Sequence, residues 1–97
     1  MTAKFIGRDD GGVRTVTVIG EVDFTNACEL ELALTGAAAR VVVELNRAVY
    51  LDSAGLRVLF AHARDGSLEL VLRRGGGVEQ VVTLSGLTEI AAVRYAG

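Results

Sequence analysis

The chain has 97 residues, of which 51% are hydrophobic and 23% charged, with a formal net charge of −2. That length fits one domain, and the composition is typical of a packed core rather than of disorder. A slightly acidic chain lacks the basic surface that nucleic acids and anionic membranes bind. No apolar run approaches the roughly 20 residues that span a bilayer, and the single cysteine, Cys28, fits a reducing compartment. We therefore expect one cytoplasmic domain over residues 1–97, which binds neither nucleic acid nor membrane.

The N-terminal residues predict a β-hairpin. Residues 4–8 can form an edge strand, and residues 13–19 are rich in the β-branched side chains that favour a second strand. Between them, Asp9-Asp10-Gly11-Gly12 favours a tight turn because Asp and Gly tolerate positive φ. We expect the two strands to pair with each other.

A helix is expected after the hairpin. It begins between residues 23 and 26 and stops near Gly36. Asp23, Thr25 or Asn26 can each supply the oxygen that caps its start. Cys28, inside this helix, is interpreted as a small core residue rather than a reactive thiol. The apolar face of the helix is expected to comprise Ala27, Leu30, Leu34 and Ala37 or Ala38.

Strands and helices alternate over the rest of the chain. Three consecutive valines make residues 40–46 a strand that we expect to be buried on both faces, as in a parallel sheet covered by helices. A helix is expected from Ser53 to about Asp65-Gly66, followed by a half-buried strand over residues 67–73 with Val71 on its polar face. After a loop over residues 74–77, we expect a helix over residues 78–84 that Gly86 closes, and a last strand over residues 90–95. The order β-β-α-β-α-β-α-β predicts a single α/β domain, in which an N-terminal hairpin joins a mixed sheet with helices on one side.

The chain offers few of the residues that a catalytic or metal site needs. The one histidine, His62, is expected on or near the surface of the second helix, roughly 13 Å along the helix from Ser53, which is beyond hydrogen-bond reach. One Cys and one His cannot build a structural zinc site. The triple glycine at residues 75–77 lacks the lysine and hydroxyl of a phosphate-binding loop. These observations argue against an enzyme and against a metal or nucleotide cofactor.

Ser53 is the residue whose chemistry stands out, and two interpretations of it stay open. In the first, Asp52 or Ser53 simply caps the helix, although Gly55 in the first turn then costs roughly 1 kcal/mol relative to alanine. In the second, Ser53 accepts a phosphate, which the free N–H groups and the dipole of the helix start would stabilise. Arg57, one turn further on, can pair with that phosphate.

Three short motifs carry a family resemblance. Asp52-Ser53-Ala54-Gly55-Leu56, between a buried strand and a helix, is similar to the Asp-Ser-[Ser/Thr/Ala]-Gly-Leu motif of STAS domains. Gly20-Glu21-Val22-Asp23 and Ser85-Gly86-Leu87 match two further motifs of that family, in the right order. The chain resembles, more narrowly, the bacterial anti-anti-sigma factors, which are also called anti-sigma factor antagonists. The resemblance covers nearly the whole chain.

The resemblance implies a regulatory binding module rather than an enzyme. In this family the serine after the motif's Asp is phosphorylated by an anti-sigma factor that is itself a serine kinase, and that serine is Ser53 here. The unphosphorylated form binds the anti-sigma factor and so frees a sigma factor. The kinase supplies ATP and magnesium, so no cofactor of the chain's own is expected, and the chain is expected to be a monomer or weak dimer. The residues expected to contact the partner are Asp23, Thr25, Asp52, Ala54, Gly55 and Arg57.

The sequence also departs from the family pattern. Ala54 stands where a second hydroxyl residue is often found, and Arg57 where a glycine is common. The chain stops at Gly97, where many members continue into another helix, whose loss would expose a sheet face and favour self-association. These departures motivate an alternative, in which the chain is a STAS subunit of a membrane transporter or lipid-transport complex and Ser53 is only a helix cap.

Overall fold

The computed structural model describes residues 2–36, 39–64 and 66–96. In chain order, the elements are β1 (Ala3–Asp10), β2 (Val13–Val22), α1 (Ala27–Leu34), β3 (Arg40–Leu51), α2 (Ser53–Ala63), β4 (Leu68–Leu72), α3 (Gly77–Ser85), a 3-10 turn (Leu87–Glu89) and β5 (Ala92–Tyr95). Apart from the 3-10 turn, this is the predicted order. The predicted positions of Ala37, Ala38 and Asp65 lie outside the described residues.

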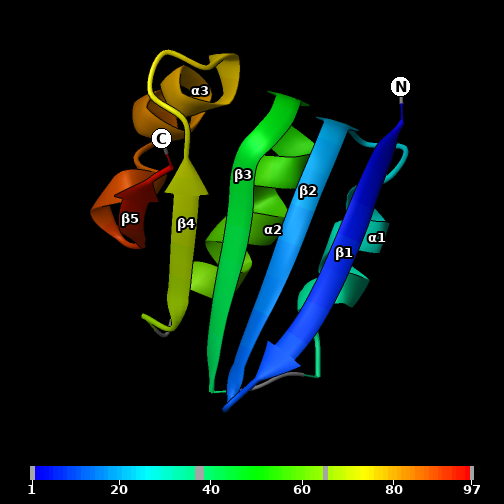
Figure 1. Ribbon diagram of the computed structural model, residues 1–97. Coiled ribbons are helices and arrows are strands. Elements are labelled where there is room, and N and C mark those ends of the chain that lie inside the picture. Colours follow the sequence, from blue (N-terminus) through cyan, green and yellow to red (C-terminus); the bar gives the residue numbers. More distant parts are fainter. Residues whose placement is uncertain (1, 37–38, 65, 97) are drawn as a thin grey trace.

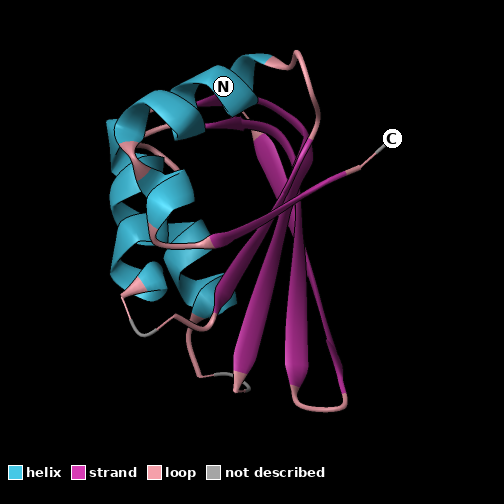
Figure 2. Cartoon of the chain, turned by 90° about the vertical axis from the view of Figure 1, so that its left-hand side faces the viewer, coloured by secondary structure: helices cyan, strands magenta, loops and turns pink. Residues whose placement is uncertain are grey.

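The five strands form one mixed sheet in the order β1-β2-β3-β4-β5. The first two strands are antiparallel, and each later strand is parallel to its neighbour. All three α-helices cover the same side of the sheet, which leaves the other side open (Figures 1 and 2). The predicted α/β architecture, with helices on one side of a mixed sheet, is therefore confirmed.

Two glycines form the turn of the hairpin between β1 and β2. Gly11 and Gly12 have φ of 57° and 83°, and Asp10 and Val13 face each other across them as the last pair of the ladder. Two consecutive positive φ values define the tight turn whose twist matches that of antiparallel strands. The predicted hairpin is confirmed, and its strands are longer than the sequence pattern indicated because pairing continues from Ala3 to Asp10.

The core lies between the helices and the inner face of the sheet. Its fully buried members include Val16, Val18, Val22, Leu30, Val43, Leu45, Leu59, Leu70, Leu72, Val82 and Leu87. On α1 the buried positions are Ala27, Leu30 and Leu34, as the spacing predicted. Cys28 is exposed, so its assignment to the core is wrong. It follows Ala27 by one position, about 100° around the helix, and so points away from the buried stripe.

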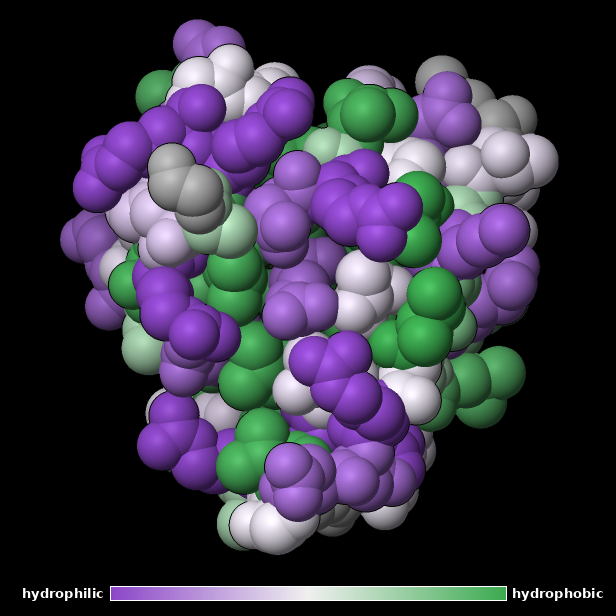
Figure 3. All heavy atoms as spheres, in the orientation of Figure 1, coloured by the Kyte–Doolittle hydropathy of each residue, from purple (hydrophilic) through white to green (hydrophobic). Residues whose placement is uncertain are grey.

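The open face of the sheet is covered by side chains rather than by helices. Val42 and Val71 are only 9% and 5% exposed, although they lie on that face. Val42 is flanked in register by Thr15 and Glu69, and Glu69 forms ion pairs with Arg40 at 3.4 Å and Arg94 at 2.9 Å. Figure 3 shows this face as largely hydrophilic with smaller apolar areas. Burial of Val42 was predicted correctly, but helices do not provide it, and Val71 is buried where exposure was predicted.

Two further elements differ from the sequence expectation. β3 continues to Leu51 rather than to residue 46, because its pairing with β2 resumes after two irregularities and runs to Val22 and Leu51. In α3, Val78 and Val82 are buried, whereas Val81 and Leu84 are 36% and 79% exposed. Only one face of that short helix therefore enters the core.

Candidate functional site

The candidate site lies where β2 and β3 end side by side, at the upper edge of the sheet in Figure 1. Val22 and Leu51 are opposite each other at the last pair of the two strands, so Asp23 and Asp52 leave the sheet together. The backbone N–H of Asp52 donates to the carbonyl of Val22 at 3.1 Å. The carboxyl ends of adjacent parallel strands are a common place for binding sites in α/β folds.

Asp52 is the N-cap of α2. Its Oδ1 accepts from the backbone N–H groups of Ala54 at 2.9 Å and Gly55 at 3.2 Å. Its Oδ2 accepts from the backbone N–H of Phe24 at 3.1 Å. One carboxylate therefore fixes both the start of α2 and the turn between β2 and α1. The cap is therefore Asp52, and Ser53 is the first residue of the helix proper.

Ser53 is exposed at this helix start, and its hydroxyl makes no hydrogen bond within the described part of the chain. The Asp52 cap also makes the helix start less favourable for a phosphate than the sequence predicted. Two N–H groups that were expected to be free for a phosphate already donate to Asp52, and that carboxylate lies beside Ser53. A phosphate on Ser53 would gain less from the helix start than the sequence suggested, and it would be repelled by a neighbouring negative charge.

Asp23 and Asn26 close the turn that leads into α1. Asp23 Oδ1 accepts from both the backbone N–H, at 2.9 Å, and the hydroxyl of Thr25. Asn26 Oδ1 accepts from the N–H of Asp23 at 3.0 Å, and Asn26 Nδ2 donates to the carbonyl of Glu21 at 2.9 Å. The Thr25 hydroxyl is the largest cause that lowers the pKa of Asp23, followed by the Thr25 N–H. Asp23 is thus held as a carboxylate beside Asp52, and the site is acidic.

Two glycines of the family motifs have structural explanations. A Cβ on Gly55 would collide with the Leu51 side chain and would approach the Val22 Cγ1 to 2.9 Å, so the first turn of α2 sits directly on the ends of β2 and β3. Gly55 is buried and supports the surface from below rather than forming part of it. Gly20 has φ of +102° and lies against the Thr2 carbonyl, a combination that favours glycine.

The exposed groups around Ser53 include one that the sequence reasoning missed. Thr25 and Arg57 are exposed, and Asp23, Asp52 and Ala54 are half-buried. Phe24 is 79% exposed, and its N–H bond to Asp52 ties it to the start of α2. The available signal in the sequence was an aromatic residue between the polar residues Asp23 and Thr25.

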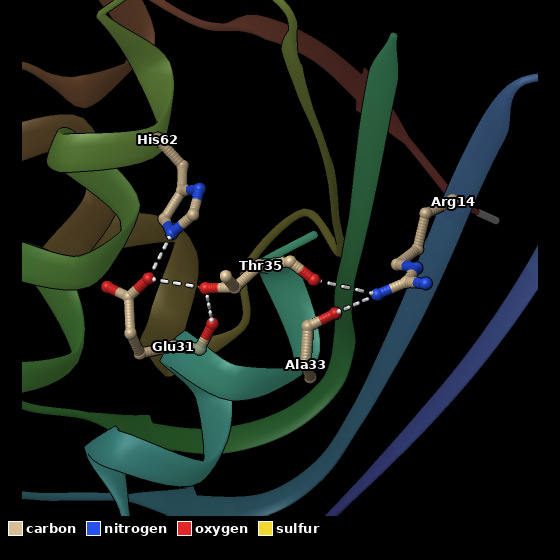
Figure 4. Close-up of polar contacts among 5 residues, drawn as sticks. All are labelled: Arg14, Glu31, Ala33, Thr35 and His62. Carbon is tan, nitrogen blue, oxygen red and sulfur yellow. Dashed lines mark hydrogen bonds and ion pairs between the residues drawn. The ribbon is translucent and has the colours of Figure 1, made fainter. Parts of the chain in front are cut away.

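His62 lies at the other end of α2, away from Ser53. Its Nε2 is 2.7 Å from Glu31 Oε2, and Glu31 also accepts from the Thr35 hydroxyl at 2.9 Å (Figure 4). The hydrogen bond from His62 is the main cause that holds the pKa of Glu31 below its ordinary value. The pair connects α1 to α2, and His62 is 22% exposed in this contact. The structure therefore gives it a packing role between helices.

No cluster of three metal-ligating side chains occurs in residues 2–36, 39–64 and 66–96. Over the same residues, none of the helices has the length and apolarity to cross a bilayer.

Comparison with known proteins identifies the family. The family model of the STAS domain matches residues 7–94. The chain belongs to the STAS domain family. None of the curated proteins compared with this STAS domain matches it significantly.

Solved structures of similar fold include anti-sigma factor antagonists. A crystal structure of such an antagonist from Mycobacterium paratuberculosis has a TM-score of 0.83 and 25% identity, over 99% of this chain and 87% of that one. SpoIIAA in its unphosphorylated form has a TM-score of 0.73 and 19% identity, over 94% and 88%. The Bacillus cell fate determinant SpoIIAA in the phosphorylated form has a TM-score of 0.66 and 16% identity, over 94% and 91%. The two SpoIIAA matches support the fold of this STAS domain.

Proposed function

We propose that this STAS domain is an anti-sigma factor antagonist that Ser53 phosphorylation switches off. In this proposal the unphosphorylated form binds an anti-sigma factor with serine kinase activity and so releases a sigma factor. The observation that carries it is the exposed Ser53 hydroxyl at the start of α2, beside a carboxylate that holds both this helix and the turn at Phe24. The 25% identical antagonist structure supports the same assignment.

The proposed docking surface consists of the exposed groups at the start of α2 and in the turn between β2 and α1. Phe24 supplies an apolar anchor of the kind that dominates protein interfaces. Thr25 and Ser53 supply hydroxyl groups, and Arg57 lies one helical turn beyond Ser53. Asp23 and Asp52 contribute negative charge, which favours a partner with a basic docking face. Ala54 lies at the half-buried margin of this surface.

The switch follows from charge at the centre of that surface. A phosphoserine carries about −1.5 to −2 charges near neutral pH. On Ser53 it would add to the carboxylates of Asp23 and Asp52, and it would bring bulk to a position that the partner must approach. The chain acts as substrate and ligand rather than as catalyst, and the kinase supplies ATP and magnesium.

The first test is phosphate mapping and binding with a candidate kinase-type anti-sigma factor. We expect ATP-dependent phosphate on Ser53 by mass spectrometry, unchanged binding by Ser53→Ala, and at least tenfold weaker binding by Ser53→Asp, the scale of about 1.4 kcal/mol. Modification of a different residue, or equal binding by Ser53→Asp and the wild type, would contradict the proposal.

A second test addresses the role of Phe24. Phe24→Ala is expected to weaken binding at least tenfold, because aromatic anchors are typical interface hot spots. Leu84→Ala is the matched control, since Leu84 on α3 has the same 79% exposure. Equal affinities for these two variants would remove Phe24 from the docking surface.

A further inference from the structure

β1 presents a long free edge at one side of the sheet (Figure 1). Among the strands of the described residues it pairs only with β2, and the register runs from Ala3 to Asp10 without a shift. The chain contains no proline, and no bulge interrupts these eight residues. A regular edge of this length offers unpaired N–H and C=O groups on which another strand can pair.

The hydrogen-bond alternation determines which residues offer those groups. In a two-residue hairpin the closing pair, here Asp10 and Val13, exchanges hydrogen bonds. At the other end, the N–H of Glu21 donates to the carbonyl of Thr2 at 2.9 Å. Both observations direct the backbone polar groups of the even-numbered residues toward β2. The groups of Ala3, Phe5, Gly7 and Asp9 therefore point outward from the edge.

The side-chain charges then select a register for antiparallel pairing with a second copy. A two-fold axis at Ile6 would place Lys4 opposite Arg8 of the other copy, which is a pair of like charges. An axis at Gly7 places Lys4 opposite Asp10 at both ends of the ladder and matches outward groups with outward groups. An axis at Phe5 also matches the outward groups, but it provides no pair of opposite charges. Among these three registers, only the Gly7 register combines backbone pairing with opposite charges at both ends of the ladder.

Apolar surface along the same edge supports association. Ile6 is 49% exposed and Leu32, on the adjacent α1, is 73% exposed. An open groove of about 620 Å³ runs beside β1 and is lined by residues that include Phe5, Ile6, Leu32 and Ala33. Exposed apolar surface of this kind marks interaction sites on soluble domains.

We propose that two copies of this chain associate through antiparallel β1 strands centred on Gly7, with Lys4 of each copy paired to Asp10 of the other. The result is a continuous sheet that spans both copies. The site around Ser53 belongs to the ends of β2 and β3, so this association is independent of the proposed function.

Charge reversal gives a sharp test, because Lys4 and Asp10 are both exposed. Lys4→Asp alone opposes Asp with Asp, and Asp10→Lys alone opposes Lys with Lys. We expect each variant to dimerise about tenfold more weakly than the wild type in sedimentation equilibrium at low salt, since two cross-strand pairs change sign. A mixture of the two variants restores opposite charges at both ends and is expected to form a heterodimer of wild-type affinity.

Arg73→Asp is the control for net charge, because it makes the same charge change as Lys4→Asp at an exposed residue next to β4. It is expected to leave dimerisation unchanged. The proposal is overturned if the wild type remains monomeric at millimolar concentration, as it would if only a strand of another protein fits this edge. It is also overturned if the mixed variants associate no better than each does alone. Neither result bears on kinase binding, so failure here and failure of the proposed function are distinguishable.

Discussion

The upper and lower ends of the helix layer use polar side chains in different ways. At the upper end, Asp52 and Asp23 accept hydrogen bonds from backbone N–H groups, and Ser53 and Phe24 are left facing solvent. At the lower end, charged side chains bond to one another and to carbonyl groups. The first arrangement fixes two turns on which a hydroxyl and a phenyl group are exposed, whereas the second ties the end of α1 to β2 and to α2. Under the proposed function, the upper end serves recognition as well as stability, whereas the lower end serves stability alone.

Arg14 is the centre of the lower end. Its guanidinium bonds both carboxylate oxygens of Asp9, at 2.8 and 3.1 Å. It also donates to the carbonyls of Ala33 at 3.2 Å and Thr35 at 3.1 Å, as Figure 4 shows. The last turn of α1 contains no basic residue of its own. A cation from β2 therefore stabilises the negative end of that helix.

The largest effect on stability is expected where the first turn of α2 packs against the ends of β2 and β3. Gly55→Val places side-chain atoms where Leu51 and Val22 already lie, so we expect a loss of about 1–3 kcal/mol in the free energy of unfolding from overpacking. Urea denaturation followed by circular dichroism measures it. The matched control is Gly77→Val in the first turn of α3, where a Cβ would meet only the Val49 carbonyl oxygen at 3.9 Å. Equal losses for the two variants would refute the contact.

The next largest effect on stability is expected when the N-cap of α2 is removed. Asp52→Ala is expected to lower the free energy of unfolding by about 1–2 kcal/mol, because the N–H groups of Ala54 and Gly55 lose their acceptor. Asp52→Asn keeps a capping oxygen and is expected to lose less than Asp52→Ala. Partner binding should fall in both variants, since Phe24 loses an ionised acceptor. If both variants unfold at the wild-type urea midpoint, Asp52 is not the organising group.

A smaller effect is expected at the lower end. Arg14→Ala removes the two bonds to Asp9 and the two to the end of α1, so the melting temperature should fall. Arg14→Lys keeps a charge without the forked donor geometry and should give an intermediate value. Binding of the anti-sigma factor should not change in either variant. A binding defect in a folded Arg14 variant would show that the two ends are coupled.

The pH dependence of stability reports on the contact between α1 and α2. The pKa of Glu31 is lowered in the folded protein, with the His62 hydrogen bond as the largest cause. The unfolded chain therefore binds more protons as pH falls through the ordinary glutamate value of 4.5. The associated stability is present above that pH and is lost as pH falls through the folded pKa. His62→Ala should flatten the dependence of the urea midpoint on pH in this acidic window, and an unchanged slope would exclude the contact.

The smallest expected effect is at Ser53 itself. Its side chain is exposed, so Ser53→Ala should change the free energy of unfolding by no more than about 0.5 kcal/mol. Ser53→Asp should also unfold near the wild-type midpoint while it loses partner binding. Such a variant separates recognition from stability. A large destabilisation by Ser53→Ala would instead support the interpretation that Ser53 serves as a helix cap.

Local patterns were enough to predict most of the fold. The Asp-Gly turn between β-branched runs predicted the hairpin, and the spacing of Ala27, Leu30 and Leu34 predicted the buried face of α1. The motif at residues 52–56 marked the start of α2 correctly. These features depend on neighbours within a few positions, so the sequence alone contains their cause.

Only the tertiary structure decided the features that depend on distant residues. Asp52 could be assigned as the cap over Ser53, and tied to Phe24, only because β2 and β3 end side by side. The exposure of Cys28 and the burial of Val71 depend on which neighbours reach each position. Gly55 is explained by side chains of two strands beneath it, one of them far away in the sequence. Local periodicity gives the direction of a side chain from its own element, whereas packing of several elements determines what that side chain meets.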